Sequence, residues 1–236
     1  RVAVDGGIGQ GNAFFLCPVG RPGIVEADVV AQIFREHRAM LELCGAEVVE
    51  IRLPLDPADA ETAGLMALDG IVLPGGESTV IGKLLKEWGL FDALIACGRA
   101  GMPMYGSCAG LILLSRDIEG PEGEALDQPR LGLLDARARR NAFGRQLDSF
   151  ETKLDVKGIA PDLEAVFIRA PLIAEVYPGV DVLASVPVGS KEYPVAVRQG
   201  RILATSFHPE LTEDRRFHEA FLELCREWQK ERAEKD

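Results

Sequence analysis

Two short segments carry residue types that could perform nucleophilic chemistry. A cysteine lies in the glycine frame Gly106-Ser107-Cys108-Ala109-Gly110, and a histidine lies in Ser206-Phe207-His208-Pro209-Glu210. A cysteine attacks as its thiolate and needs a nearby base to move the proton, a task that suits His208. Glu210 follows two residues later, where its carboxylate can accept the second imidazole N–H and fix the tautomer. The two segments therefore predict a Cys-His-Glu catalytic site.

The residues around the cysteine predict a strand, a sharp turn and a helix. An apolar run, Met102–Tyr105, precedes the frame, and an aliphatic run, Leu111–Leu114, follows it. Glycines at positions 106 and 110 would let the strand and the helix pass without Cβ clashes. The partial positive charge at the start of a helix would favour a thiolate at Cys108. A lone cysteine is usually structural, but packing alone does not require a glycine on each side.

The chain has three histidines, so few side chains could act as the base. His208 follows an apolar strand at its carboxyl end, where open α/β sheets place their ligands. His37 is surrounded by Arg35, Glu36 and Arg38, and His218 lies among charges in a C-terminal helix. We expect both of these histidines to be solvated and take His208 as the base.

A third segment, Leu73-Pro74-Gly75-Gly76-Glu77-Ser78-Thr79, ends another apolar strand. The simpler interpretation is a tight turn with Ser78 as a helix N-cap. The functional interpretation is that the backbone of Gly75 and Gly76 offers an N–H to a developing oxyanion. The segment matches neither a phosphate-binding loop nor a dinucleotide fingerprint.

Strand-like and helix-like stretches alternate along the chain, which indicates an α/β protein with a mostly parallel sheet covered on both faces. The expected strands are Arg1–Val4, Ala46–Arg52, Gly70–Leu73, Met102–Tyr105, Gly132–Ala136, Thr152–Val156, Ala165–Ile168, Val180–Ser185, Pro194–Arg198 and Ile202–Phe207. The expected helices are Glu26–Cys44, Ser78–Trp88, Leu90–Ala100, Leu111–Ser115 and Arg215–Glu234. Closely spaced strands in the second half predict antiparallel additions to the sheet edge. We expect a single domain over residues 1–236, with a surface loop at Pro121–Pro129 and a fraying, charged helix end over 226–236.

Composition excludes several classes of partner. A formal net charge of −11 argues against a nucleic acid or an anionic membrane as the main partner. No apolar stretch reaches the roughly 20 residues that span a bilayer, and the chain does not open with a signal peptide. Five cysteines, an odd and widely spaced set, indicate a reducing cytoplasm and show no zinc pattern.

Together these segments resemble the class I glutamine amidotransferases and, more narrowly, the glutaminase subunits of pyridoxal 5′-phosphate synthase. The narrower resemblance rests on segments outside the triad and covers roughly residues 34 to 228. These segments are Pro-Gly-Gly-Glu-Ser-Thr at 74–79, Arg-Asn-Ala-Phe-Gly-Arg-Gln at 140–146, Asp-Ser-Phe-Glu at 148–151, Phe-Ile-Arg-Ala-Pro at 167–171 and Ser-Phe-His-Pro-Glu-Leu-Thr at 206–212. A generic glutaminase would share only the cysteine frame and the His-Pro-Glu.

The resemblance implies a three-layer α/β/α fold with the cysteine turn at its centre. It implies that Cys108 is the nucleophile, His208 the general base and then acid, and Glu210 the orienting carboxylate. Backbone N–H groups of Ala109 and of the Gly75-Gly76 turn would form the oxyanion hole. The glutamine-binding residues would be Gly76, Glu77, Ser78, Arg140, Ile168 and Arg169. No metal or organic cofactor is implied, and the ammonia would pass to a (β/α)8-barrel synthase subunit.

The chain departs from the family pattern near its beginning. Gly9-Gln10-Gly11 matches the end of the family's first strand, but about 20 further residues, 12–33, precede Phe34-Arg35-Glu36-His37. Ala13–Cys17 is a competing candidate for that first strand. Two rival functions also remain open: another cysteine enzyme of similar fold (the glutaminase of a different amidotransferase, or a DJ-1/PfpI-like hydrolase), and a regulatory subunit without catalysis.

Overall fold

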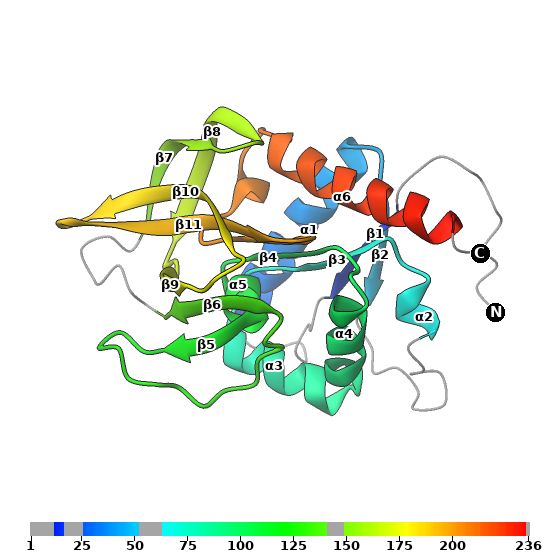
Figure 1. Cartoon of the computed structure of the whole chain (residues 1–236), viewed down its shortest axis with the longest axis horizontal. Helices are drawn as coiled ribbons and strands as arrows, with labels where there is room; N and C mark the ends of the chain where they lie inside the picture. Colours follow the sequence, from blue (N-terminus) through cyan, green and yellow to red (C-terminus); the bar gives the residue numbers. More distant parts are fainter. Residues whose placement is uncertain (1–11, 17–25, 52–62, 141–148, 235–236) are drawn as a thin grey trace.

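The computed structural model describes residues 12–16, 26–51, 63–140 and 149–234. The expected strand Arg1–Val4, the segment Gly9-Gln10-Gly11 and residues 141–146 lie outside these residues. Seven of the described strands form one sheet, and helices pack on its two faces (Figure 1).

The main sheet has the order β10-β11-β12-β4-β3-β1-β2. The five strands from β12 to β2 run parallel to one another, whereas β10 and β11 are antiparallel additions at one edge. The bounds are β1 Asn12–Leu16, β2 Glu47–Ile51, β3 Gly70–Leu73, β4 Met104–Ser107, β10 Asp181–Val188, β11 Lys191–Gln199 and β12 Ile202–Thr205. The candidate strand at 13–17 is thus a strand over residues 12–16, hydrogen-bonded between β2 and β3.

Alternate residues of the central strands point into two separate hydrophobic cores. Val72, Tyr105 and Leu203 pack with α1 (Glu26–Leu43) and α6 (Arg216–Ala233). Their strand neighbours, such as Ile71 and Met104, pack with α3 (Ser78–Glu87), α4 (Leu90–Arg99) and α5 (Ala109–Leu114). Because a strand alternates its side chains between its faces, an apolar strand of this kind requires a helical layer on each side. The three-layer α/β/α arrangement is confirmed, and Figure 1 shows α6 and the α3–α4 pair on opposite sides of the sheet.

Local sequence explains where the helices begin and end. In α1, the buried residues Ile33, Phe34, Met40 and Leu41 follow helical spacing, and Gly45 adopts a left-handed φ of 85° just after the helix. In α3, the N-cap is Glu77, whose carboxylate accepts from the N–H groups of Thr79 and Val80. Ser78 is therefore the first residue of this helix and not its cap, because the longer carboxylate reaches two free N–H groups.

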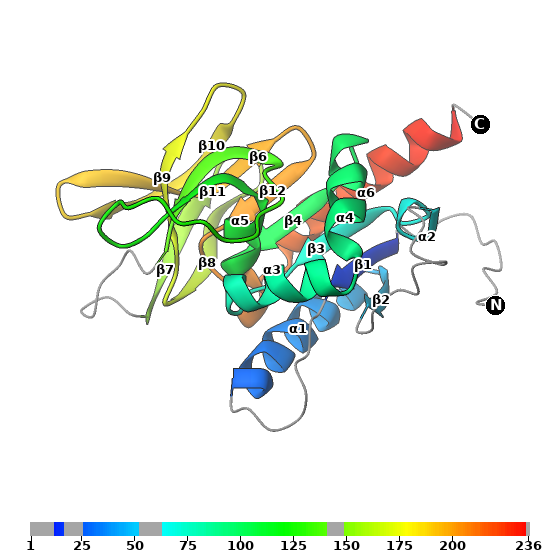
Figure 2. The same ribbon diagram turned by 90° about the horizontal axis from the view of Figure 1, so that it is seen from below.

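The second half is more divided than the sequence predicts. Only β10 and β11 extend the main sheet. A second sheet joins β5 (Ser115–Glu119), β6 (Leu134–Arg139) and β9 (Leu172–Val176), and a hairpin pairs β7 (Ser149–Val156) with β8 (Ala160–Ile168). All of these elements lie at the β10–β11 end of the molecule in Figures 1 and 2. The strands β5 and β9 are not predicted: β5 is of mixed polarity, and β9 is a run of only five residues.

The C-terminal helix is held by contacts close to its end, whereas the sequence predicted a fraying end. α6 stays helical to Ala233, and Trp228 is buried. The guanidinium of Arg232 donates to the Asp69 carboxylate at 3.0 Å and to the Met66 carbonyl. The short helix α2 (Ala63–Met66) is thereby tied to the end of the chain. None of the described helices is both long and apolar enough to cross a membrane.

Candidate active site

The nucleophile candidate lies on a strained turn between β4 and α5. Cys108 has φ 50° and ψ −102°, a conformation that L-residues rarely adopt. A Cβ on Gly110 would lie 1.9 Å from the carbonyl oxygen of Leu73, and one on Gly106 would lie 2.5 Å from the carbonyl carbon of Gly110. The two glycines are thus required by close backbone approach. The N–H of Cys108 donates to the Thr205 carbonyl at 2.8 Å, which fixes the turn against β12.

His208 and Glu210 follow β12, beside this turn. The N–H of His208 donates to the Val166 carbonyl of β8 at 2.8 Å, and Pro209 begins a short 3-10 helix, Pro209–Leu211. Nδ1 of His208 lies 2.6 Å from Oε1 of Glu210, and both side chains are buried. The carboxylate therefore holds Nδ1 protonated and leaves Nε2 as the basic nitrogen.

Neighbouring charged groups outweigh the effect of burial on the pKa values of His208 and Glu210. Burial alone would lower the pKa of His208, but the Glu210 carboxylate and the Cys108 sulfur hold it well above its usual value. Burial alone would raise the pKa of Glu210, but His37 and His208 keep it far below its usual range. The arrangement favours an imidazolium at His208, between the Cys108 sulfur and the Glu210 carboxylate.

The three oxyanion-hole candidates converge on the same place. A Cβ on Gly75 would lie 2.6 Å from Cε1 of His208, so this backbone lies directly against the imidazole. Gly76 has φ 138°, in the region open to glycine. Ala109 is the first residue of α5, immediately after the cysteine. The structure thus brings the Gly75-Gly76 turn, Ala109 and His208 around Cys108.

Three of the predicted glutamine-binding residues are connected by one polar cluster. Arg140 donates to Oε1 of Glu77 at 2.6 Å, to Oγ1 of Thr79 at 2.9 Å and to Oε1 of Gln128 at 2.7 Å. Gln128 in turn donates to Oγ of Ser78 at 3.1 Å. The cluster ties the end of β6 to the start of α3, next to the Gly75-Gly76 turn.

Sequence reasoning missed Gln128. It lies at the end of the expected surface loop 121–129, and it is 7% exposed although most of the loop is exposed. The only signal was its polar amide next to Pro129, which is too common to single it out. Its burial comes from the contacts of its amide with Ser78 and Arg140.

Ile168 and Arg169, the remaining predicted binding residues, lie at the carboxyl end of β8. This strand end adjoins His208 through the Val166 carbonyl. Ile168 is 38% exposed, and Arg169 has a left-handed φ of 43°. In the described part of the chain, no hydrogen bond links this pair to Glu77 or Arg140.

The expectation that His37 and His218 are solvated is wrong. Both are fully buried, between α1, α6 and β4. Nδ1 of His37 lies 3.1 Å from Nε2 of His218, while Nε2 of His37 lies 2.9 Å from Oγ of Ser107 and 3.2 Å from Oε1 of Glu210. The charged residues next to each histidine in the sequence lie on other faces of the helix. Their charge therefore does not predict whether the face that carries the histidine is exposed.

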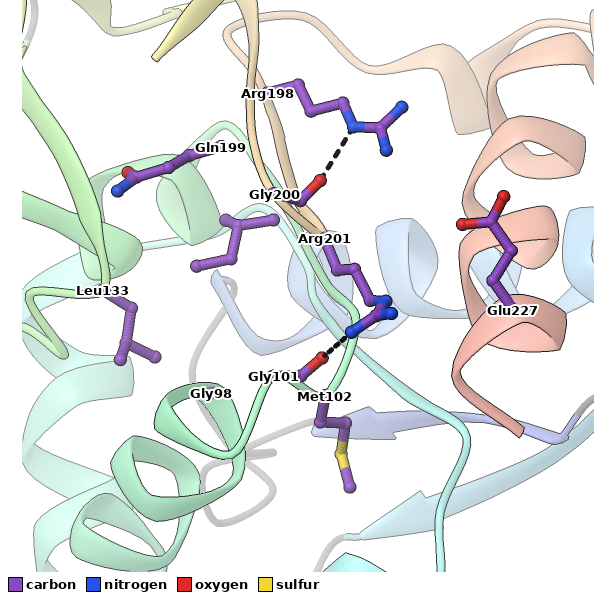
Figure 3. Close-up of a pocket in the computed structure, with 10 residues that line it drawn as sticks. Gly98, Gly101, Met102, Leu133, Arg198, Gln199, Gly200, Arg201 and Glu227 are labelled. Carbon is purple, nitrogen blue, oxygen red and sulfur yellow. Dashed lines mark hydrogen bonds between the residues drawn. The ribbon is translucent and has the colours of Figure 1, made fainter. Parts of the chain in front are cut away.

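A separate hollow of about 520 Å³ lies at the amino ends of β4 and β12, opposite the cysteine turn. Two of its arginines are engaged: Arg201 pairs with Glu231. Arg201 also donates to the Gly101 carbonyl, and Arg198 donates to the Gly200 carbonyl (Figure 3). Among the described residues, no group of three or more His, Cys, Asp or Glu side chains is arranged to hold a metal ion.

A family model for the SNO glutamine amidotransferase family matches residues 29–227. The chain belongs to this glutamine amidotransferase family. The resemblance to glutamine amidotransferases inferred from the motifs is thereby confirmed.

Two relatives with high sequence identity are subunits of pyridoxal 5′-phosphate synthase. The pyridoxal 5′-phosphate synthase subunit PdxT of Pelotomaculum thermopropionicum is 50% identical over 193 residues, which cover 81% of this chain and 90% of the relative. The PdxT subunit of Frankia alni is 51% identical over 193 residues, with 81% and 89% covered. A solved glutamine amidotransferase structure superimposes with a TM-score of 0.73 at 42% identity, covering 91% of this chain and 99% of that chain.

A more distant structure supports the fold alone. The glutaminase domain of Trypanosoma brucei CTPS, solved with bound acivicin, has a TM-score of 0.55 at 14% identity and covers 92% of this SNO-family chain and 94% of that chain. The three-layer fold is therefore shared well beyond the SNO family.

Proposed function

We propose that this chain is the glutaminase subunit of a pyridoxal 5′-phosphate synthase, hydrolysing L-glutamine to glutamate and ammonia. The observation that carries the proposal is the site itself: a cysteine at φ 50° on a turn, with an imidazole behind it that is bonded to a buried carboxylate at 2.6 Å. Relatives named as PdxT, about half identical over most of their length, support the specific pathway.

In the proposed reaction, the Cys108 thiolate attacks the side-chain amide carbon of glutamine. The N–H groups of Ala109 and the Gly75-Gly76 turn hold the tetrahedral oxyanion. The His208 imidazolium gives its Nε2 proton to the departing ammonia, which leaves a γ-glutamyl thioester on Cys108. Neutral His208 then takes a proton from water, whose oxygen attacks the thioester and releases glutamate. Glu210 stabilises the imidazolium at each stage.

Substrate recognition is proposed to use the polar cluster beside the turn. The backbone of Gly76-Glu77-Ser78, the Arg140 guanidinium, and Ile168-Arg169 would bind the α-carboxylate and ammonium of glutamine. The Arg140 side chain is 23% exposed and donates to three acceptors. Its orientation is therefore fixed before glutamine binds. A fixed donor loses little entropy on binding, which favours selectivity for a charged ligand.

The proposed partner is a (β/α)8-barrel synthase subunit that consumes the ammonia. Ammonia released into water is protonated and loses its nucleophilicity, so it should pass internally from Cys108 to the partner. The barrel would combine it with a pentose phosphate and glyceraldehyde phosphate. The glycine pair at 75–76 gives the oxyanion turn enough freedom to become productive only in that complex.

We also propose that residues 1–236 form one glutamine amidotransferase domain working in the cytoplasm, without a metal or organic cofactor. The main sheet supports the first point, because it joins β1, near the start of the chain, to β12, near its end. Cys44, Cys97, Cys108 and Cys225 are free thiols, which suits a reducing compartment.

The test is ammonia release from glutamine, measured on the chain alone and on the chain mixed with a barrel synthase subunit. We expect strong stimulation by the partner and loss of all activity in Cys108→Ala. Hydrolysis of peptides or glyoxals without ammonia release from glutamine would instead favour a DJ-1/PfpI-like hydrolase. Normal binding to the synthase without turnover would favour a regulatory subunit.

A further inference from the structure

A buried chain of polar side chains continues behind the candidate triad. Oε1 of Glu210 is 2.6 Å from Nδ1 of His208 on one side and 3.2 Å from Nε2 of His37 on the other. His37 then contacts His218 at 3.1 Å. The chain runs from β4 and the 3-10 helix through α1 to α6, and all of its members are at most 2% exposed.

The protons of this chain can be assigned from the available partners. Among the described residues, Nδ1 of His218 has no hydrogen-bond partner. A buried bare nitrogen costs less than a buried N–H without an acceptor, so the proton of neutral His218 belongs on Nε2. That N–H points to Nδ1 of His37, which must accept it. The proton of His37 then lies on Nε2, facing Ser107 and Glu210.

The other described groups around His37 carry no second carboxylate that is free to contact its Nε2. The hydroxyl of Tyr105 on β4 is bonded to Oγ1 of Thr205, and Tyr105 meets His37 edge-on with 5.6 Å between ring centroids. Asp214, before α6, is engaged by Arg216. Ser107 is uncharged, and its Oγ, 2.9 Å from Nε2 of His37, shares that N–H with Oε1 of Glu210 at 3.2 Å. Among the described residues, Glu210 is thus the carboxylate next to Nε2 of His37.

We propose that His37 is a positioning residue: its Nε2–H holds the Glu210 carboxylate in place, so that Glu210 can stabilise the His208 imidazolium during turnover. The proposal rests on the proposed glutaminase function. The two histidines contact the same carboxylate oxygen, which restricts the rotation of the carboxylate and favours its ionised form. The His218 contact fixes the tautomer of His37, so α6 contributes to the site without touching the substrate.

The test compares His37→Leu with His37→Gln. Leucine fills a similar volume without a donor, whereas the glutamine Nε2 can reach the position of the histidine Nε2. In the complex with a barrel synthase subunit, we expect His37→Leu to lower kcat roughly tenfold with little change in the KM for glutamine, because Glu210 does not touch the substrate. We expect His37→Gln to recover most of the kcat.

A second readout does not depend on glutamine. The rate of Cys108 alkylation by iodoacetamide, followed by mass spectrometry of the peptide, reports the thiolate that the His208 imidazolium supports. We expect His37→Leu to lower this rate at neutral pH and His37→Gln to restore it. Leu94→Ala is the matched control. Leu94 is buried in α4, in the core on the opposite face of the sheet, so its truncation destabilises the fold without touching His37, His218 or Glu210.

The possible results separate this proposal from the proposed function. Equal losses of kcat in His37→Leu, His37→Gln and Leu94→Ala would overturn the positioning role and would mean that His37 contributes only packing. Full glutaminase activity in a folded His37→Leu variant would also overturn it. If the wild-type complex releases no ammonia, but Cys108 alkylation still depends on the donor at residue 37, the positioning role stands and the glutaminase function is wrong.

Discussion

The backbone of Gly75 and the imidazole of His208 lie in direct contact, since a Cβ on Gly75 would lie 2.6 Å from Cε1. We expect Gly75→Ala to push the imidazole away from Cys108 and to lower kcat at least about tenfold, because misplacement by an ångström is costly to catalysis. The measurement is ammonia release with the synthase subunit. Gly64→Ala is the control, because nothing lies within 4 Å of the added methyl group, and it should keep full activity.

Cys108→Ala should abolish ammonia release and leave the fold intact. The thiol is 9% exposed and its removal opens little new space, so the free energy of unfolding should change by less than about 1 kcal/mol. Thermal unfolding and binding to the synthase subunit check the fold. Cys97→Ala removes a fully buried thiol from α4 and should show the opposite result, with normal turnover and lower stability. Turnover by Cys108→Ala would refute the assignment of the nucleophile.

Gly110→Ala should prevent stable folding. The added methyl group would lie 1.9 Å from the Leu73 carbonyl oxygen, and this obstacle is backbone that cannot rotate away. We expect a loss of more than about 3 kcal/mol in the free energy of unfolding, above the usual cost of overpacking. Urea unfolding measures it. A variant with wild-type stability would mean that β3 and α5 are farther apart than described.

Arg140→Lys should weaken glutamine binding more than it slows the chemistry. A lysine ammonium cannot reproduce the fork that bonds Glu77, Thr79 and Gln128 together. We expect the KM for glutamine to rise roughly tenfold, equal to about 1.4 kcal/mol, with a smaller change in kcat. Arg226→Lys, on the exposed Glu223 pair of α6, is the charge-matched control and should leave both constants unchanged.

His218 should make the fold sensitive to acid. Burial and the neighbouring His37 lower the pKa of His218 to about 3 from an ordinary 6.5. Between these values the unfolded chain binds a proton that the folded chain does not, so stability should fall as the pH falls from about 6.5 to 3. His218→Phe, which keeps an aromatic ring and cannot titrate, should flatten the dependence of the free energy of unfolding on pH in this window. An unchanged slope in urea titrations would contradict the shift.

The candidate catalytic motif could be recognised in the sequence because its signal is local. The glycines at 106 and 110 report a close approach between a strand and a helix that are adjacent in the chain. His208 and Glu210 are two residues apart, so their hydrogen bond follows from one turn. Most of the parallel core was predictable for the same reason, because strands such as β3 are short apolar runs bounded by turn residues. The exception is β1, which the sequence offered only as a competitor of Arg1–Val4.

The sequence alone therefore determined the cysteine turn, the His-Glu pair, the family and the layered fold, whereas the tertiary structure decided which polar residues are buried. His37 and His218 lie 181 residues apart and meet only because α1 and α6 cover the same face of the sheet. Gln128 likewise becomes buried only when its loop reaches Ser78 and Arg140. The physical reason is that the burial of a polar side chain depends on partners from distant segments, which the neighbours along the chain do not report.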